Sequence, residues 1–201
     1  MPKKKIKKTK LPAKLVKYLE QAGVKHEILE HKTVYTAIDA AMTMKKKLDE
    51  IAKSLLVKAD RNYYVVILPA DQNLDFKKLG VCLERVSGKK IKTVKIPSEK
   101  IMSRILKIKA GSLSAFGNLH KLPVVMEKKM TKKNKAVFPA GSFNHSVEMA
   151  VKDFIKLENA ILGSFGIKKK VKLVKTTKSR KCGSAKKKGA GKKKKVSKAK
   201  K

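Results

Sequence analysis

The chain has 201 residues, of which 53 are Lys or Arg and only 15 are Asp or Glu, giving a formal net charge of +38 at pH 7. This charge excludes a neutral enzyme that has no polyanionic partner, because self-repulsion opposes compaction unless a polyanion or counter-ions screen it. No apolar run is long enough to span a membrane, and the N-terminus lacks the apolar stretch of a secretion signal. Cys82 and Cys182 form neither a disulfide framework nor a zinc cluster, which indicates a reducing compartment. Together with the missing apolar segments, this leads us to expect a cytoplasmic protein with no membrane partner.

The distribution of charge divides the chain into three parts. Residues 1–10 hold six Lys and residues 168–201 hold 17 Lys and one Arg, and neither segment contains an acid. Residues 11–167 hold 29 basic and all 15 acidic residues, as in a globular domain. The last segment is too poor in apolar residues to fold alone and is predicted to be a disordered arm.

The Lys-rich arms are predicted to bind nucleic acid by counter-ion release, and a solubilising tail without a specific partner is the alternative. The expected contacts in the C-terminal arm are Lys168, Lys169, Lys170, Lys186, Lys187, Lys188, Lys192, Lys193, Lys194 and Lys195.

Hydrophobic periodicity in residues 11–167 predicts both helices and strands. Helices are expected at 11–22, at 36–44 with Thr36 as N-cap, at 73–83 with Asn73 as N-cap, from 97 onward and at 153–160. Strands are expected at 24–29, 51–57, 63–68, 91–96, 123–126, 136–138 and 146–151, with a hairpin turn at 59–62. The order shows no repeat and no regular strand–helix alternation, which favours an α+β domain with a mixed, largely antiparallel sheet.

Lys53 is the first residue that stands out, because the rest of 51–57 is almost entirely apolar. A lysine in such a strand needs a reason to be there. Either it points to solvent from a strand with one wet face, or it faces a cleft that binds phosphate or carboxylate.

Two glycine-bearing loops stand out next. Gly111 and Gly117 flank a run of small residues, a composition typical of a backbone that approaches a ligand or simply makes a turn. The loop after 136–138 places Gly141, Ser142 and His145 together, and a surface hairpin explains this composition equally well.

Motifs of other enzyme classes are missing. The chain has no Walker or Rossmann glycine pattern, no catalytic triad motif, no HExxH and no CxxC. His26, His31 and His120 do not have metal-ligand spacing, so neither a metal site nor a cofactor is expected.

Taken together and in order, these features resemble the YbaK family of aminoacyl-tRNA deacylases, which includes the editing domain inserted in bacterial prolyl-tRNA synthetases. The resemblance runs from about Leu11 to Ala160. It is carried by Val34-Tyr35-Thr36-Ala37 with Ala40-Ala41, Ile51-Ala52-Lys53-Ser54-Leu55, Val66-Ile67-Leu68-Pro69-Ala70-Asp71, Leu74-Asp75 with Lys78-Leu79, Gly111-Ser112-Leu113-Ser114-Ala115-Phe116-Gly117, Leu122-Pro123-Val124-Val125 and Ala140-Gly141-Ser142-Phe143-Asn144-His145.

The resemblance implies a mixed α/β domain with a barrel-like sheet and helices packed outside it. It also implies hydrolysis of the ester between a wrong amino acid and the tRNA 3′ end, without a metal and without a protein nucleophile. Mischarged tRNA is the implied substrate, and an aminoacyl-tRNA synthetase is a second expected partner.

The family's site residues carry over by position. Lys53 is expected to hold the backbone phosphate or the terminal adenosine, and Tyr35, Thr36 and Ser54 to line the pocket. Gly111 and Ser112 are expected to fix the aminoacyl group. Gly141, Ser142 and His145 form the loop that places the substrate, with His145 acting either as a general base or as a loop anchor.

The chain also departs from the family pattern. Ala115 replaces a frequent Pro, and Pro139 stands where cysteinyl-tRNA deacylases often carry Ser, which favours an alanine-type preference. The long Lys-rich arms are not part of the pattern. Two alternatives therefore stay open: a non-catalytic protein that uses the fold and arms to bind DNA or the ribosome, and a regulatory domain that binds a free amino acid.

Overall fold

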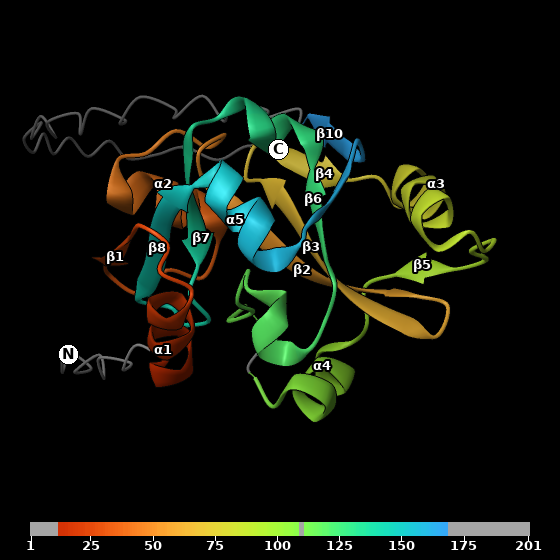
Figure 1. The fold of residues 1–201 in the computed structure, drawn as a ribbon, viewed down its shortest axis with the longest axis horizontal. Coiled ribbons are helices and arrows are strands. Elements are labelled where there is room, and N and C mark those ends of the chain that lie inside the picture. Colours follow the sequence, from red (N-terminus) through yellow and green to blue (C-terminus); the bar gives the residue numbers. More distant parts are fainter. Residues whose placement is uncertain (1–11, 109–110, 169–201) are drawn as a thin grey trace, which may run out of the picture. The chain divides into compact units, whose positions relative to one another are not determined.

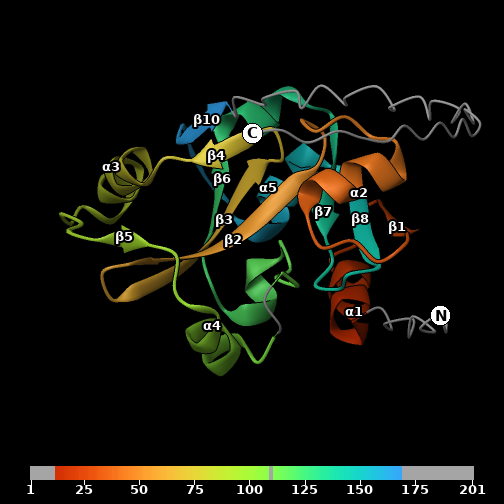
Figure 2. The same ribbon diagram turned by 180° about the vertical axis from the view of Figure 1, so that it is seen from behind.

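The computed structural model describes residues 12–108 and 111–168. These residues form five α-helices and ten strands. The helices are α1 (Ala13–Gln21), α2 (Ala37–Met44), α3 (Phe76–Ser87), α4 (Glu99–Leu106) and α5 (Val151–Glu158). In Figure 1 α5 lies in front of the sheets, whereas α2 and β2 face the viewer in Figure 2, so helices cover opposite sides of the strands.

The strands of the described part form three sheets. The largest has the order β5 (Val94–Lys95), β2 (Ala52–Ala59), β3 (Asn62–Pro69), β6 (Val124–Glu127) and β9 (Ile161–Gly163). The second has the order β1 (His26–Glu30), β8 (His145–Ala150) and β7 (Lys135–Pro139), and the third pairs β4 (Gln72–Leu74) with β10 (Gly166–Lys168). Only the β3–β6 and β6–β9 pairs are parallel, so the predicted mixed α+β architecture is confirmed.

The prediction of a barrel-like sheet is wrong in one respect, because the described strands do not close into a barrel. The five-stranded and three-stranded sheets meet through a single parallel bridge between Ile51 and Val137. In the five-stranded sheet, β5 has only two residues and pairs only with β2, so it forms one edge of that sheet. Beside the bridge that joins Ile51 to Val137, the two sheets leave an opening between β2 and β7 and do not form a continuous wall.

The hairpin of β2 and β3 fixes the position of Lys53. Ala59 pairs with Asn62, so Asp60 and Arg61 form a two-residue turn, and Asp60 has φ +49°. The Asp60 carboxylate accepts hydrogen bonds from the backbone N–H groups of Lys92 and Thr93, which holds the β5 segment against the hairpin. This register places Lys53 opposite Leu68 of β3.

Three clusters of buried apolar side chains form the core. The first contains Phe138 and Phe154, whose rings stack with centroids 4.0 Å apart. The second fills the space between the large sheet and α3. The third lies under α2 and includes Ala40, Ile51 and Val137, and it forms the floor beside the opening between the two sheets.

Most local predictions agree with these elements, and two need correction. Thr36 caps α2 as predicted, with its Oγ1 accepting a hydrogen bond from Asp39 N at 3.1 Å. Asn73, by contrast, does not cap a helix: it pairs with Ile167 in the β4–β10 sheet, and Asp75 caps α3 instead. The strand expected at 91–96 is reduced to Val94–Lys95.

The two predicted arms lie outside the described residues, apart from Lys168. This residue ends β10 and pairs with Gln72. Among the helices that the structure describes, none combines the length and the apolar character that a membrane crossing requires.

Candidate active site

A cavity of about 430 Å³ lies where α2, β2 and β7 meet. Its wall includes small apolar side chains of α2 and of the adjoining strands, which leave room for a ligand. Six residues singled out from the sequence line it: Tyr35, Thr36, Lys53, Ser54, Gly111 and Ser142. The elements that provide this wall lie next to one another in Figure 2.

Lys53 lines the cavity from β2 and is partly buried. Its Nζ donates a hydrogen bond of 2.8 Å to the backbone carbonyl of Gln72. This contact holds the amine at the start of β2, near the start of β4, and the side chain does not simply point to bulk solvent. The geometry therefore presents a cation to any anion that enters the cavity.

Ser54 and Gly111 join β2 to the glycine-bearing loop. Ser54 Oγ donates a hydrogen bond of 2.6 Å to the carbonyl of Leu113. Gly111 has φ +83°, and a Cβ built there would lie 3.3 Å from the ring of Phe143, so a side chain would be both strained and crowded. Glycine at this position lets the backbone itself border the cavity.

Tyr35 stands at the rim of the cavity. Its side chain is 72% exposed, and its ring lies 5.3 Å from that of Phe143, measured between centroids. Phe143 supports one side of the tyrosine, and the large exposed fraction leaves ring surface available to a ligand.

The loop that contains Gly141 and His145 is bound to the segment that precedes α2. His31 N donates to Asn144 O at 2.8 Å, and Val34 N donates to Phe143 O at 3.0 Å. Asn144 Nδ2 adds a hydrogen bond of 3.0 Å to Thr33 Oγ1. These contacts fix two segments that are more than 100 residues apart in the sequence on the same side of the cavity.

His145 does not line the cavity and reaches it through Ser142. Its Nδ1 lies 3.0 Å from Ser142 Oγ, which also accepts a hydrogen bond from Asn144 N at 3.1 Å. Gly141 and Ser112 are also absent from the wall. Gly141 has φ +82°, and a Cβ built there would lie 3.4 Å from Ser114 Cβ and 3.7 Å from Ser112 O, so its loop packs against the loop that begins at Gly111.

His31 and Ser146 line the cavity and were not predicted as site residues. His31 Nε2 lies 2.9 Å from Ser146 Oγ, and His31 Nδ1 lies 2.9 Å from the carbonyl of Lys32. Nothing in the local sequence indicates this pair, because it depends on the antiparallel register of β1 and β8.

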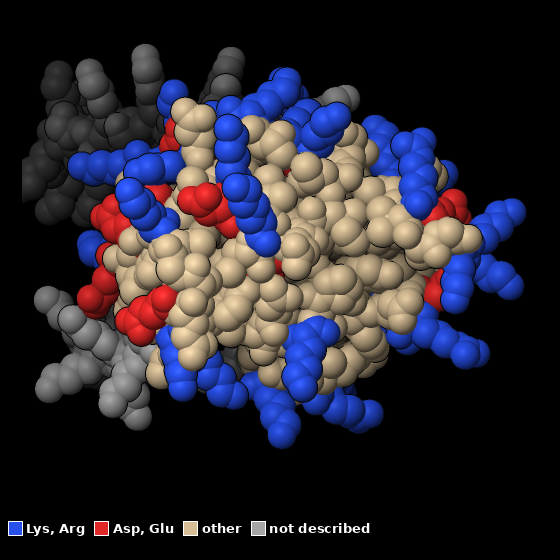
Figure 3. Space-filling view, viewed as in Figure 1, with Lys and Arg blue, Asp and Glu red and all other residues tan. Residues whose placement is uncertain are grey.

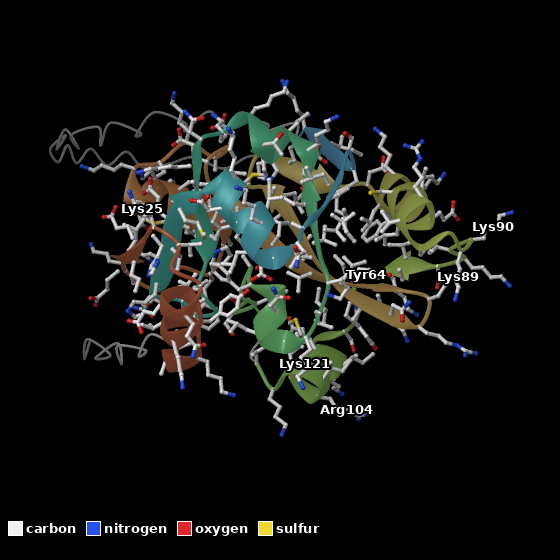
Figure 4. All side chains as sticks on the ribbon, viewed as in Figure 1. Lys25, Tyr64, Lys89, Lys90, Arg104 and Lys121 are labelled. Atoms are coloured by element: carbon white, nitrogen blue, oxygen red, sulfur yellow. The ribbon has the colours of Figure 1, made fainter. Side chains whose placement is uncertain are left out.

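Charge is distributed unevenly over the described surface. In Figure 3 most acidic side chains on the visible face lie on the side of β1 and β8, whereas Lys and Arg cover the remaining edges. Figure 4 shows Lys89 and Lys90 projecting from the turn after α3, and Arg104 and Lys121 projecting at the edge near α4. Within residues 12–108 and 111–168, no group of three or more His, Cys, Asp or Glu side chains is placed to hold a metal ion.

Solved structures share this fold. A hypothetical protein, APE2540, has a TM-score of 0.67 at 17% identity, over 77% of this chain and 99% of that chain. A protein proposed to be a trans-editing enzyme for prolyl-tRNA synthetase has a TM-score of 0.63 at 19% identity, over 77% of this chain and 96% of that chain. A proposed signal transduction protein from Marinobacter aquaeolei VT8 has a TM-score of 0.57 at 14% identity, over 79% of this chain and 31% of that chain. At these identities the likeness shows the fold alone.

The family model for the aminoacyl-tRNA editing domain matches residues 31–157, which include every residue that lines the cavity. The chain therefore belongs to the aminoacyl-tRNA editing domain family, and the resemblance found in the sequence is confirmed. Membership implies aminoacyl-tRNA deacylase activity in general, with mischarged tRNA as the substrate class. A comparison with curated proteins gives no match.

Proposed function

We propose that this chain is a metal-independent aminoacyl-tRNA deacylase that acts in trans and hydrolyses the ester between a wrong amino acid and the tRNA 3′ end. The observation that carries the proposal is the cavity, where Lys53 and several hydroxyl groups meet small apolar side chains. Its volume of about 430 Å³ falls within the usual range for small-ligand sites, and its mixture of a cation with apolar walls suits a nucleotide end joined to a small amino acid.

Hydrolysis of a neutral ester requires an oriented water molecule and donors for the oxyanion that develops on the carbonyl oxygen. In the proposed reaction water adds to the ester carbonyl, and the bond between the carbonyl carbon and the ribose oxygen then breaks. The products are a free amino acid and a tRNA with a free 3′-terminal hydroxyl. Lys53 holds a terminal phosphate, and the backbone at Gly111 borders the aminoacyl group.

Ser142 and His145 have separate parts in this proposal. Ser142 contacts the substrate because it lines the cavity, and His145 holds Ser142 from behind. This arrangement supports the loop-anchor role for His145 over the general-base role, since a base must reach the proton that it removes.

The body of the tRNA is proposed to bind to the Lys-rich arms and to the basic edges of the described surface. The net charge of +38 and the exposed cations in Figure 4 support this assignment. A synthetase remains a proposed second partner, and prolyl-tRNA synthetase is the first to test, because one structural neighbour is proposed to edit in trans for that enzyme.

A panel of mischarged tRNAs tests the proposal, with release of free amino acid measured in the presence and absence of a chelator. We expect release from at least one non-cognate pair, with small amino acids such as alanine on proline tRNA tested first, and no effect of the chelator. A protein that binds tRNA but releases no amino acid from any pair would instead be a non-catalytic nucleic-acid-binding protein.

A further inference from the structure

His31 and Ser146 form a hydrogen-bonded pair in the cavity wall to which the mechanism above gives no part. Ser146 belongs to β8 and is 7% exposed, so its hydroxyl is buried except toward the cavity that it lines. We propose that this pair binds the α-ammonium group of the aminoacyl ester. The inference rests on the proposed function and assigns one further part of the same site.

The hydrogen bonds of His31 decide the orientation of the Ser146 hydroxyl. The carbonyl oxygen of Lys32, 2.9 Å from His31 Nδ1, can only accept, so Nδ1 carries a proton. In the neutral ring Nε2 is then an acceptor, and it receives the proton of Ser146 Oγ, 2.9 Å away. The hydroxyl proton is thereby directed to His31, and the lone pairs of Ser146 Oγ remain as acceptors at the cavity wall.

An ammonium group brings three N–H donors into the cavity and needs acceptors there, because burying an unpaired charge is costly. Among the described residues that line the cavity there is no Asp or Glu. Thr36 Oγ1 and Ser142 Oγ each accept one backbone N–H, from Asp39 and Asn144, which uses one of the two lone pairs of each hydroxyl. Both are therefore less open to an ammonium than Ser146 Oγ, whose own proton is directed to His31. Ser54 retains acceptor capacity, but it follows Lys53 directly in β2, and that cation repels an ammonium.

The surrounding charges favour a cation beside Ser146. His31 also borders a second hollow. The charged residues that line it are three acids, Glu27, Glu30 and Glu148, and two bases, Lys32 and Lys46. Lys46 is paired with Glu148 at 2.8 Å. Lys32 and Lys46 offset two of the three carboxylates, so the charges on the wall of this second hollow sum to −1, whereas Lys53 enters the cavity from a strand of the other sheet. This polarity orients an aminoacyl nucleotide with its phosphate toward Lys53 and its ammonium toward Ser146.

The experiment compares a reactive aminoacyl-tRNA with its deaminated form, in which a hydroxyl replaces the α-amino group. Single-turnover rates are measured for the wild type and for Ser146→Ala. We expect Ser146→Ala to lower the rate on the aminoacyl-tRNA roughly 10- to 100-fold, the range for losing a hydrogen bond to a charged group, and to change the rate on the deaminated tRNA by less than about twofold. Equal losses on both substrates would overturn the proposal.

Two variants control for structure. Ser146→Thr keeps a hydroxyl on a strand that tolerates β-branched residues, so it should retain most of the preference for the amine. Ser54→Ala removes another cavity hydroxyl and should slow both substrates alike. Unfolding temperatures show whether each variant is folded.

A binding measurement covers the case in which the deaminated tRNA reacts too slowly. Non-hydrolysable 3′-amide analogues of aminoacyl-adenosine, one with the α-amine and one with an α-hydroxyl, are titrated by calorimetry. The wild type should bind the amine form roughly tenfold or more tightly, and Ser146→Ala should bind both forms equally. If the wild type binds both equally, the inference is wrong. A wild type that releases no amino acid from any tRNA would instead contradict the proposed function.

Discussion

Nδ1 of His145 lies 3.0 Å from Ser142 Oγ, and through this contact the histidine supports a cavity that it does not itself line. The same serine oxygen accepts the backbone N–H of Asn144, so His145 and the loop backbone together hold Ser142 in place. A short chain of hydrogen bonds thus joins β8 to the wall of the cavity.

This relationship predicts the effect of replacing His145. His145→Ala should change which amino acid is removed and should lower the rate by less than about tenfold, because Ser142 keeps its bond to Asn144. A general base would instead cost about 10²–10⁴ in rate on every substrate. His145→Asn supplies an acceptor in place of Nδ1 and should restore the original selectivity. Deacylation of a panel of mischarged tRNAs by the three proteins separates the two roles.

Tyr35 is expected to stack against an unpaired base of the tRNA 3′ end. Stacking of a base on an aromatic side chain contributes about 1–3 kcal/mol. Tyr35→Ala should therefore lower the affinity for aminoacyl-tRNA roughly tenfold, whereas Tyr35→Phe should leave it unchanged. Met42, which is 68% exposed on α2 and does not line the cavity, provides the matched control as Met42→Ala. Equal affinities for the Tyr35→Ala and Met42→Ala proteins would remove Tyr35 from the site.

The C-terminal segment is tested by deletion of residues 170–201, which leaves β10 intact. If this segment neutralises about four phosphates, the slope of log K against log[salt] for tRNA binding should decrease by roughly 3 to 4. The unfolding temperature of the remaining chain should hardly change. An unaltered salt dependence would show that the segment takes no part in binding.

Asp60 gives a prediction about acid stability. Hydrogen bonds from the backbone N–H groups of Thr93 and Lys92 hold the pKa of its carboxyl below the ordinary value of 3.8. A carboxyl whose pKa is lower in the folded state stabilises the fold above its unfolded pKa, and this contribution is lost as the pH falls through the folded pKa. Asp60→Asn should therefore flatten the fall in stability below about pH 4, as measured by urea unfolding at a series of pH values.

The sequence predicts local features better than pairings between distant segments. Thr36 caps α2 through a contact three residues away, and the turn at Asp60 follows from neighbouring strands, so both could be predicted. The prediction that Asn73 caps a helix is wrong, because its pairing with Ile167 cannot be recognised in the local sequence. The strands β9 and β10 were missed for the same reason.

The candidate site shows the same division. Lys53, Ser54 and Gly111 were found because their residue types are unusual for their surroundings or match a family motif, and the structure places all three in the cavity wall. His31 and Ser146 are 115 residues apart, and neither residue type is unusual in its segment. Only the register of β1 with β8 brings them together.

The assignment of this cavity as the active site depends most on Lys53, and replacing this residue should also affect stability. Lys53→Ala removes the hydrogen bond to Gln72 O and should cost about 1 kcal/mol of unfolding free energy. Most of the tRNA affinity should remain, since phosphate contacts elsewhere bind the body of the tRNA. Lys53→Arg keeps the charge but presents a wider planar group, so a cavity fitted to a lysine should tolerate it poorly.

The most direct test is single-turnover deacylation of a mischarged tRNA by Lys53→Ala beside Lys58→Ala. Lys58 lies on the same strand, with its Nζ 5.6 Å from the centroid of the Tyr63 ring, and it does not line the cavity. Lys58→Ala should deacylate at the wild-type rate, whereas Lys53→Ala should be inactive while folded and still able to bind tRNA. Deacylation by Lys53→Ala at the wild-type rate would contradict the assignment of this cavity as the active site.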